Sequence, residues 1–254
     1  MPKNSIQLIN DATPLNRREM FTRAAGTAAT LFVAGSALSC GAVHATDPGD
    51  DDGSSGCVLT AALTEGPYFV DERLNRSDLR ADPVSGAVST GTPLQLTFNV
   101  SRSSNSACSP LTGALIDVWH CDASGVYSDV GGSGTGRKFL RGYQITDASG
   151  VVNFTTVYPG WYQGRAVHIH FKVRVIAGTT TTYEFTSQFF FDENVTSTVH
   201  TQSPYNTRGQ RDTRNTTDGI YSSLSAAAKA ALTLRTMPSG SGYDGVIDLV
   251  VRLA

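Results

Sequence analysis

Hydrophobic and polar residues alternate along several short stretches of this chain. Side chains of a β-strand point alternately to opposite faces, so a period of two predicts a strand with one buried face. Clusters of Gly, Ser, Thr and Asp separate these stretches, as expected of turns. A helix is predicted only at 222–234. The predicted strands are 94–100, 114–118, 167–176, 183–191 and 246–253.

The order of these elements predicts the fold class. Many short strands joined by turn-rich loops are typical of a sandwich or barrel, and the strand–helix alternation of a doubly wound sheet is missing from the pattern. We therefore predict an all-β fold, an antiparallel β-sandwich core with one short helix in the C-terminal region. A content of 40% hydrophobic residues is enough for a substantial core. The net charge of -2 and the lack of a long basic cluster argue against a nucleic-acid partner.

The beginning of the chain has the order of an export signal, which we assign to residues 1–45. Arg17 and Arg18 precede a weakly apolar run, and a small-residue cleavage site ends at Ala45. This order resembles a bacterial twin-arginine signal. The run is short and rich in Gly, Ala and Thr, so no stable membrane span is predicted. We expect an exported protein, periplasmic or secreted, with a lipid anchor on Cys40 as the alternative.

Residues 46–56 are acidic, rich in Gly and without apolar anchors, which predicts a flexible linker. The folded domain is then 57–254. Three cysteines would remain after cleavage, and an oxidising compartment allows one disulfide. We expect Cys57 to pair with Cys108 and Cys121 to stay free, although the sequence leaves the other pairings open. No two cysteines have the CxxC spacing of a zinc site.

Two histidines share one face of the predicted strand 167–176. His168 and His170 alternate with apolar residues, so their rings point the same way. Residues two apart on a strand lie about 6.5–7 Å apart at Cα, which lets two imidazoles reach one metal ion. The pair alone also fits a solvated polar face without a ligand.

Nearby tyrosines add candidate ligands. The turn YPGWYQGR places Tyr162 and Arg165 just before the histidine strand. Further upstream, a strand ends in a Gly-containing turn that presents Tyr127. Phenolate oxygen is a hard anionic donor, and a ferric ion can bind it deprotonated. In a β-sandwich, however, a tyrosine is more often a core aromatic with a satisfied hydroxyl.

From about Cys57 onward the chain resembles the intradiol ring-cleavage dioxygenases, the family of catechol 1,2-dioxygenase and protocatechuate 3,4-dioxygenase. The most specific motif is PGWYQGRAVHIHF, and TEGPYF, GALIDVWHCDASGVYSD and TSQFF support it. The resemblance implies an Fe(III) cofactor and a substrate pocket lined by Arg165 and Gln188. Tyr158 is an alternative to the second tyrosine ligand. The ligands that the resemblance implies are Tyr127, Tyr162, His168 and His170.

The same resemblance implies the reaction. Both atoms of O2 enter a catechol-type diol, and the ring opens between its hydroxyls to a cis,cis-muconate. Fe(III) with two tyrosinates and one hydroxide has no net charge, and the hydroxide and the dissociating Tyr162 would accept the two protons of the diol. Arg165 would stabilise the developing negative charge, and Gln188 would form hydrogen bonds. Catechol, protocatechuate, hydroxyquinol and larger lignin-derived rings all stay open as substrates, and a homodimer is the candidate assembly.

The remaining aromatic and imidazole side chains have ordinary roles in this interpretation. Trp119 and Trp161 are predicted to pack or to form pocket walls. His120 and His200 are predicted at the surface or in local hydrogen bonds, because neither extends a ligand motif.

Two other classes of protein compete with this interpretation. Cupin-like oxygenases and zinc hydrolases also use histidine pairs, but they usually add a carboxylate ligand. Glu184 and Asp192 lie beyond the strand, and neither falls at the cupin spacing. The other alternative is a secreted β-sandwich module that binds glycans or a protein without catalysis.

Overall fold

The computed structural model describes residues 57–104 and 107–253. The predicted export signal, the linker and Cys40 lie outside these residues. The strands are β1 (Pro93–Ser104), β2 (Ala107–Pro110), β3 (Leu115–Trp119), β4 (Arg141–Ile145), β5 (Val151–Val157), β6 (His168–Ala177), β7 (Thr180–Phe190), β8 (Arg235–Ser239) and β9 (Gly242–Val251). The helices are α1 (Glu193–His200), α2 (Gly219–Ser222) and α3 (Ala226–Ala231), with short 3-10 turns at Gly132–Gly134 and Tyr205–Arg208.

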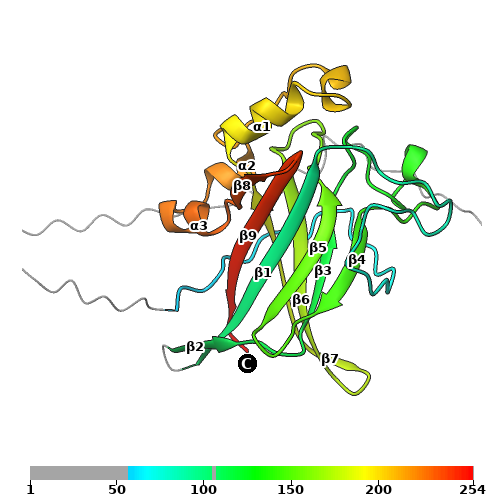
Figure 1. The fold of residues 1–254 in the computed structure, drawn as a ribbon. Helices are drawn as coiled ribbons and strands as arrows, with labels where there is room; N and C mark the ends of the chain where they lie inside the picture. The colour runs from blue at the N-terminus through cyan, green and yellow to red at the C-terminus, as the bar shows by residue number, and fades with distance from the viewer. Residues whose placement is uncertain (1–56, 105–106, 254) are drawn as a thin grey trace, which may run out of the picture. The chain divides into compact units, whose positions relative to one another are not determined.

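The strands form two sheets packed face to face (Figure 1). The five-stranded sheet has the order β2-β1-β9-β8, with β5 also paired to β1. The four-stranded sheet has the order β4-β3-β6-β7. The predicted all-β sandwich is confirmed. One pair departs from the antiparallel expectation, because β1 and β9 run parallel. These two strands come from opposite ends of the domain, so no tight turn forces them to be antiparallel.

All five predicted strands are present, while β2, β4, β5 and β8 were not predicted. The prediction of a single helix at 222–234 is wrong. That region contains α3 and the end of α2, and α1 lies outside it, at the end of the strands opposite the β6–β7 turn (Figure 1). Helix α1 is rich in β-branched residues, which have modest helix propensity. It forms where the Asp192 side chain caps its first turn by accepting hydrogen bonds from the N–H groups of Asn194 and Val195.

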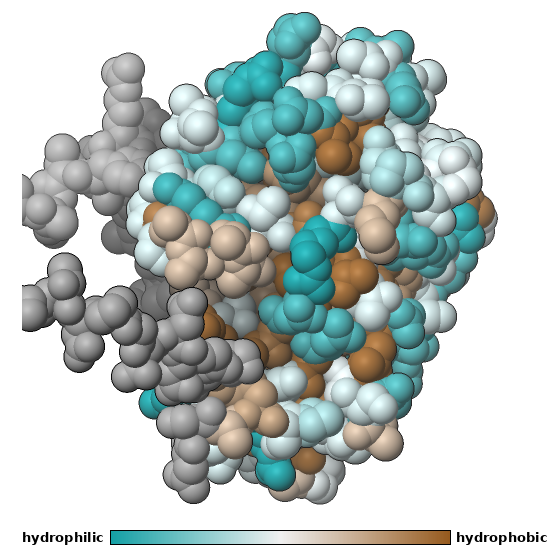
Figure 2. All heavy atoms as spheres, turned by 60° about the vertical axis from the view of Figure 1, so that its left-hand side comes forward, coloured by the Kyte–Doolittle hydropathy of each residue, from teal (hydrophilic) through white to brown (hydrophobic). Residues whose placement is uncertain are grey.

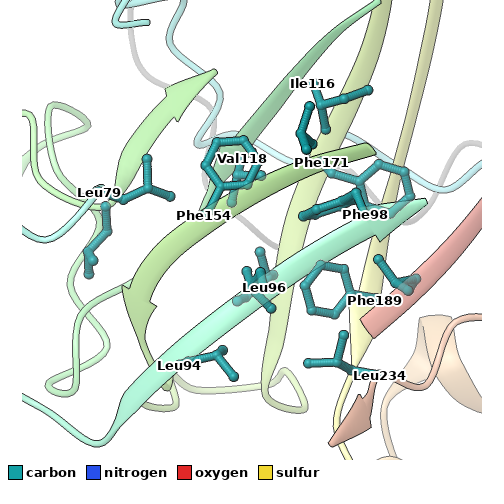
Figure 3. Close-up of a cluster of buried hydrophobic side chains, with 14 of the residues drawn as sticks. Leu79, Leu94, Leu96, Phe98, Ile116, Val118, Phe154, Phe171, Phe189 and Leu234 are labelled. Atoms are coloured by element: carbon teal, nitrogen blue, oxygen red, sulfur yellow. The ribbon is translucent and has the colours of Figure 1, made fainter. Parts of the chain in front are cut away.

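The core lies between the two sheets, where apolar side chains of both sheets meet (Figure 3). Phe98 of β1 packs edge-on against Phe171 of β6 and Phe189 of β7, with ring centroids 5.9 Å away in both cases. These three rings have no exposed surface. The inward face of β6 therefore belongs to the core, and its other face carries His168 and His170.

A segment of residues 57–78, here called the covering segment, crosses the outer face of the four-stranded sheet, and its two ends reach the five-stranded sheet at Val250 and Thr155. Its Leu63 N–H donates to the Thr186 carbonyl of β7 (3.1 Å), and its Glu65 pairs with Lys172 of β6 (2.5 Å). The disulfide from Cys57 to Cys108 ties its start to β2, which confirms the predicted pairing. Because of this segment, β6 is buried on both faces from His168 to Val173.

Among the helices of the described residues, none has the length and apolar character needed to cross a bilayer.

On the face drawn in Figure 2, hydrophobic residues lie in small areas separated by hydrophilic ones. Scattered apolar residues of this kind are normal on a protein surface.

Candidate metal centre

Two loops reach the start of β6 because their glycines allow close contact between backbones. Gly125 has φ +76°, and a Cβ atom there would lie 2.2 Å from the Trp161 carbonyl oxygen. A Cβ atom at Gly160 would lie 2.3 Å from the Ala123 carbonyl oxygen. Only glycine fits such contacts. The loop that presents Tyr127 is therefore held against the turn that presents Tyr162.

The histidine pair faces a common point. His168 Nε2 lies 3.0 Å from His170 Nε2. His168 Nδ1 lies 2.6 Å from the Ala166 carbonyl oxygen, which makes Nδ1–H the donor and leaves the Nε2 lone pair available. Such a backbone bond on the second ring nitrogen is the usual way in which a metal-binding histidine is oriented. The Trp119 ring stacks on His170 at 5.0 Å with an interplanar angle of 6° and fixes its plane.

Both candidate tyrosines lie beside this pair. The Tyr162 hydroxyl donates to His168 Nε2 at 3.2 Å. The Tyr127 ring lies 5.7 Å from the Tyr162 ring and 6.3 Å from the His170 ring. The Tyr127 hydroxyl and His170 Nδ1 are buried without a hydrogen-bond partner among the described residues. A buried hydroxyl without a partner costs about 1–3 kcal/mol, which a ligand bound there would offset.

The covering segment closes one side of this cluster. The Tyr68 ring stacks on Tyr127 at 4.4 Å and meets Tyr162 edge-on at 5.7 Å. A Cβ atom at Gly66 would be in van der Waals contact with the His170 ring, 3.5 Å from Cε1. Phe69 packs edge-on against Trp119 at 4.9 Å. These contacts place aromatic side chains of the covering segment along one side of the candidate ligands.

Burial sets the protonation states of the site. It lowers the pKa of His168 to about 3 and that of His170 well below its usual value, with nearby positive charge acting in the same direction. Burial also raises the pKa of Tyr127 and of Tyr162 above 10. At neutral pH the imidazoles are therefore neutral and able to bind a metal. The phenols ionise only when a strong local positive charge, such as that of a metal ion, is bound beside them.

Arg165 and Gln188 lie together beside this cluster. The Arg165 Nη2 group donates to Gln188 Oε1 at 2.5 Å, and Arg165 Nε donates to the Asp218 carboxylate at 2.8 Å. Gln188 pairs with His170 in the β6–β7 register, which places both side chains on the outer face of the sheet. Burial alone would raise the pKa of Asp218, but bonds from the Tyr221 N–H, Arg165 and the Ala166 N–H hold it below its usual value.

Tyr162 and Tyr158 are the two candidates for the second tyrosine ligand, and they lie in different surroundings. The Tyr158 side chain is fully buried in the sandwich core, and its hydroxyl is bonded to the Thr196 hydroxyl at 2.7 Å. Its ring packs on Phe191 at 4.3 Å. The structure therefore brings Tyr162 and not Tyr158 to the histidine pair.

The other aromatic and imidazole side chains have mostly local roles. Trp161 packs against the main core, and the Arg208 guanidinium lies 4.8 Å from its ring. His120 forms local bonds, as predicted, to the Cys121 carbonyl (2.8 Å) and the Thr156 hydroxyl (2.7 Å), but it is fully buried and not at the surface. His200 Nε2 donates to the Pro159 carbonyl at 3.2 Å.

The residues present fit a ferric ion better than zinc. Within 57–104 and 107–253, no group of three or more His, Cys, Asp or Glu side chains is placed to hold a metal ion. Cys121, which is free and buried, has its thiol directed to the Gly160 carbonyl oxygen at 3.5 Å. A metal bound by His168 and His170 would thus complete its coordination with tyrosine oxygens, which are hard donors suited to Fe(III).

The sequence did not identify three residues that contribute to the site, Tyr68, Arg141 and Asp218. Tyr68 stood within the TEGPYF motif, so a signal for it existed. Arg141 is 2% exposed and donates to the backbone carbonyls of Tyr68 (2.6 Å) and Ser128 (2.5 Å), next to Tyr127. Asp218 reaches the site from about 50 positions downstream of Arg165. No periodicity distinguishes a buried arginine or aspartate from an exposed one.

Fold and site together define an all-β sandwich protein with a candidate two-histidine, two-tyrosine metal centre. The family model described as Dioxygenase matches residues 64–208, more than half of the 254-residue chain. This match includes all four candidate ligands together with Arg165 and Gln188. The chain belongs to the intradiol ring-cleavage dioxygenase family.

Individual relatives agree with this family. Chlorocatechol 1,2-dioxygenase of Pseudomonas sp. (strain P51) is 32% identical over 146 residues, which is 48% of this chain and 53% of that protein. The chain thus spans about half the length of this curated relative. The intradiol ring-cleavage dioxygenase from Tetranychus urticae is 29% identical with a TM-score of 0.64, covering 77% of this chain and 95% of that one. The dioxygenase domain of a carbohydrate-binding fusion protein from Streptomyces sp. SirexAA-E is 30% identical with a TM-score of 0.55, covering 78% and 100%.

Proposed function

We propose that this protein is an Fe(III)-dependent intradiol dioxygenase that cleaves a catechol-type diol between its hydroxyls to give a cis,cis-muconate. The observation that carries the proposal is the convergence of His168, His170, Tyr162 and Tyr127 in one buried cluster. Bound Fe(III) would supply the Lewis acidity that ionises the two phenols and the diol and activates the ring towards O2.

The ligand residues have separate tasks in this reaction. His168, fixed by its bond to Ala166, and His170, stacked on Trp119, would hold the metal as neutral donors. Tyr127, on which the Tyr68 ring stacks, would hold the metal as a phenolate. Tyr162 lies on a turn and is only part-buried, so of the two tyrosines it would be the one to accept a proton of the diol on its phenolate oxygen.

Arg165 and Gln188 act on the substrate side. The Arg165 guanidinium would stabilise the negative charge that develops on the substrate ring. Gln188 would donate a hydrogen bond to the substrate from its amide. The aromatic side chains of the covering segment reduce the local dielectric, which strengthens the electrostatic effect of Arg165.

A visible spectrum and an oxygen-uptake assay test this proposal. Phenolate bound to Fe(III) gives a burgundy protein by charge transfer, and we expect Tyr162→Phe and Tyr127→Phe to lose or strongly shift this colour. We also expect the iron-loaded protein to consume O2 with at least one of catechol, protocatechuate, hydroxyquinol and a larger lignin-derived diol. A colourless zinc-loaded protein, or iron-loaded protein that consumes no O2 with any of the four, would overturn the proposal.

We also propose that the protein is exported. The Cys57–Cys108 disulfide supports this, because such bonds persist in oxidising compartments. A twin-arginine route would carry the folded protein with its metal already inserted. Replacing Arg17 and Arg18 by lysine should retain the protein in the cytoplasm, as measured by cell fractionation. Unchanged export of that variant would contradict the assignment of the signal.

A further inference from the structure

Asp218 is a fully buried carboxylate at the edge of the site. Its two oxygens have different partners. Oδ1 accepts hydrogen bonds from the N–H groups of Ile220 (2.8 Å) and Tyr221 (2.9 Å), so it caps the first turn of α2. Oδ2 accepts from Arg165 Nε (2.8 Å) and from the Ala166 N–H (2.8 Å). A residue that only capped α2 would have no need of the second pair of bonds.

These bonds determine the orientation of the Arg165 guanidinium. Asp218 holds its Nε, and the Gln188 side-chain oxygen holds its Nη2. Gln188 is itself held, because its amide nitrogen donates to the Thr64 carbonyl of the covering segment at 3.3 Å. A planar guanidinium fixed at two of its nitrogens has a single orientation. The positive charge of Arg165 is thereby held at one place.

The same carboxylate oxygen also reaches the metal side of the site. Oδ2 binds the N–H of Ala166, and the carbonyl of Ala166 accepts the Nδ1–H of His168 at 2.6 Å. One side chain therefore fixes both the arginine and the backbone residue that orients His168. An aspartate in the C-terminal part of the domain thus connects the substrate side with the ligand side.

We propose that Asp218 is a positioning residue of the active site, which acts through Arg165 to hold its charge against the substrate. The inference rests on the proposed function. Among the described residues, Asp218 has no hydrogen bond to any of the four candidate metal ligands. Its bond to Ala166 is to the N–H, and the Ala166 carbonyl that orients His168 remains when the carboxylate is removed. Removal of the carboxylate should therefore leave the metal bound and reduce turnover through Arg165.

The variant Asp218→Ser separates positioning from helix capping. Serine is a good N-cap residue, so it can still accept a bond in the first turn of α2, while it cannot pair with Arg165. We expect iron content and the visible band to be retained and kcat to fall about 10- to 100-fold, as is usual when a residue supporting an active-site group is removed. The matched control is Asp192→Ser, since Asp192 caps α1 in the same way and has no bond to Arg165. The control should keep kcat within about 2-fold. If Asp218→Ser does not fold, Asp218→Asn, which is closer in shape, takes its place.

A double-mutant cycle with Arg165→Ala tests whether Asp218 acts through Arg165. If it does, adding Asp218→Ser to Arg165→Ala should change kcat by less than about 2-fold, because residues acting as one unit are not additive. Independent effects that multiply would overturn the inference. So would a kcat of Asp218→Ser within about 2-fold of the wild-type value.

A measurement without turnover distinguishes this inference from the proposed function. In the full chain loaded with diamagnetic Ga(III), the Arg165 Nε–H should exchange slowly with solvent by NMR, because it is bonded to a buried carboxylate. Asp218→Ser should accelerate this exchange, and Asp192→Ser should not. Unchanged exchange in Asp218→Ser would refute the positioning role even in an active enzyme. A wild-type protein that consumes no O2 while showing the protected Nε–H would instead refute the proposed function.

Discussion

The outer face of β6 has two regions with opposite chemistry. In its second half, Lys172 pairs with Glu65 (2.5 Å) and Glu184 (2.7 Å), and Arg174 pairs with Asp117 (2.7 Å). In its first half, His168 and His170 face each other with no carboxylate between them. Both halves lie under the covering segment, on one face of one strand.

This difference shows that the second half of the strand stabilises the fold, while the first half carries the candidate metal ligands. Burying a charge is costly unless it is paired, so the two cations of the second half have carboxylates on neighbouring segments. The histidines of the first half are buried as neutral groups and keep nitrogen atoms directed at a shared point. Partnered charges hold the covering segment in place, and the neutral histidines can serve as donors for the metal ion that we propose.

The largest expected effect follows from removing a donor in the first half. His168→Ala or His170→Ala should abolish iron retention, because the remaining donors cannot hold the ion in a buried site. Iron stoichiometry and visible absorbance measure this. His200→Ala, which removes a histidine bonded only to a backbone carbonyl, is the control and should bind iron fully. An active, iron-loaded His170→Ala protein would contradict the ligand assignment.

Removing a charge in the second half should affect stability instead. Arg174→Met leaves Asp117, whose side chain is 9% exposed, without its partner. We expect the free energy of unfolding to fall by about 3–5 kcal/mol, measured by denaturant titration. The double variant Arg174→Met/Asp117→Asn should recover part of that loss. Loss of iron at unchanged stability would show that the two halves are not separate.

The third prediction uses His120, a buried histidine with partners on both ring nitrogens. Burial lowers its pKa to about 4, from an ordinary value of 6.5. Between pH 4 and pH 6.5 the His120 imidazole binds a proton in the unfolded chain but not in the folded protein. The contribution of neutral His120 to the free energy of unfolding is therefore fully present above pH 6.5 and is lost as the pH falls towards 4. By pH 5 the loss is about 2 kcal/mol.

Unfolding titrations of the wild type and of His120→Asn at pH 7 and pH 5 measure this contribution. The variant lacks the titrating group, so its stability should depend less on pH over that interval. An equal pH dependence in the two proteins would show that His120 does not carry the effect.

The smallest expected effect concerns Tyr158, the tyrosine that lies in the core. Tyr158→Phe removes its hydroxyl bond to Thr196 and should cost about 1 kcal/mol in unfolding free energy. The burgundy colour should be unchanged, in contrast to Tyr162→Phe. A bleached Tyr158→Phe protein would reverse the assignment of the second tyrosine.

Much of the fold was predictable because each buried strand has one apolar face against the core. The alternation in β1, β3, β6, β7 and β9 reports this burial directly. Among the strands that were missed, β2 has only four residues, and β8 has four of its five residues exposed. Helix α1 was missed because its stability comes from the Asp192 cap and from packing, and not from local propensity.

The sequence by itself determined the strand pattern, the shared face of His168 and His170, and the motifs that carry the family resemblance. Local spacing is enough for these features, because a strand fixes the direction of each side chain. The tertiary structure alone decided which tyrosine lies beside the histidines, and it alone brought Asp218 to Arg165 and covered β6 with charged partners. Such contacts join segments tens of residues apart, and their geometry depends on how the loops pack, which no local pattern encodes.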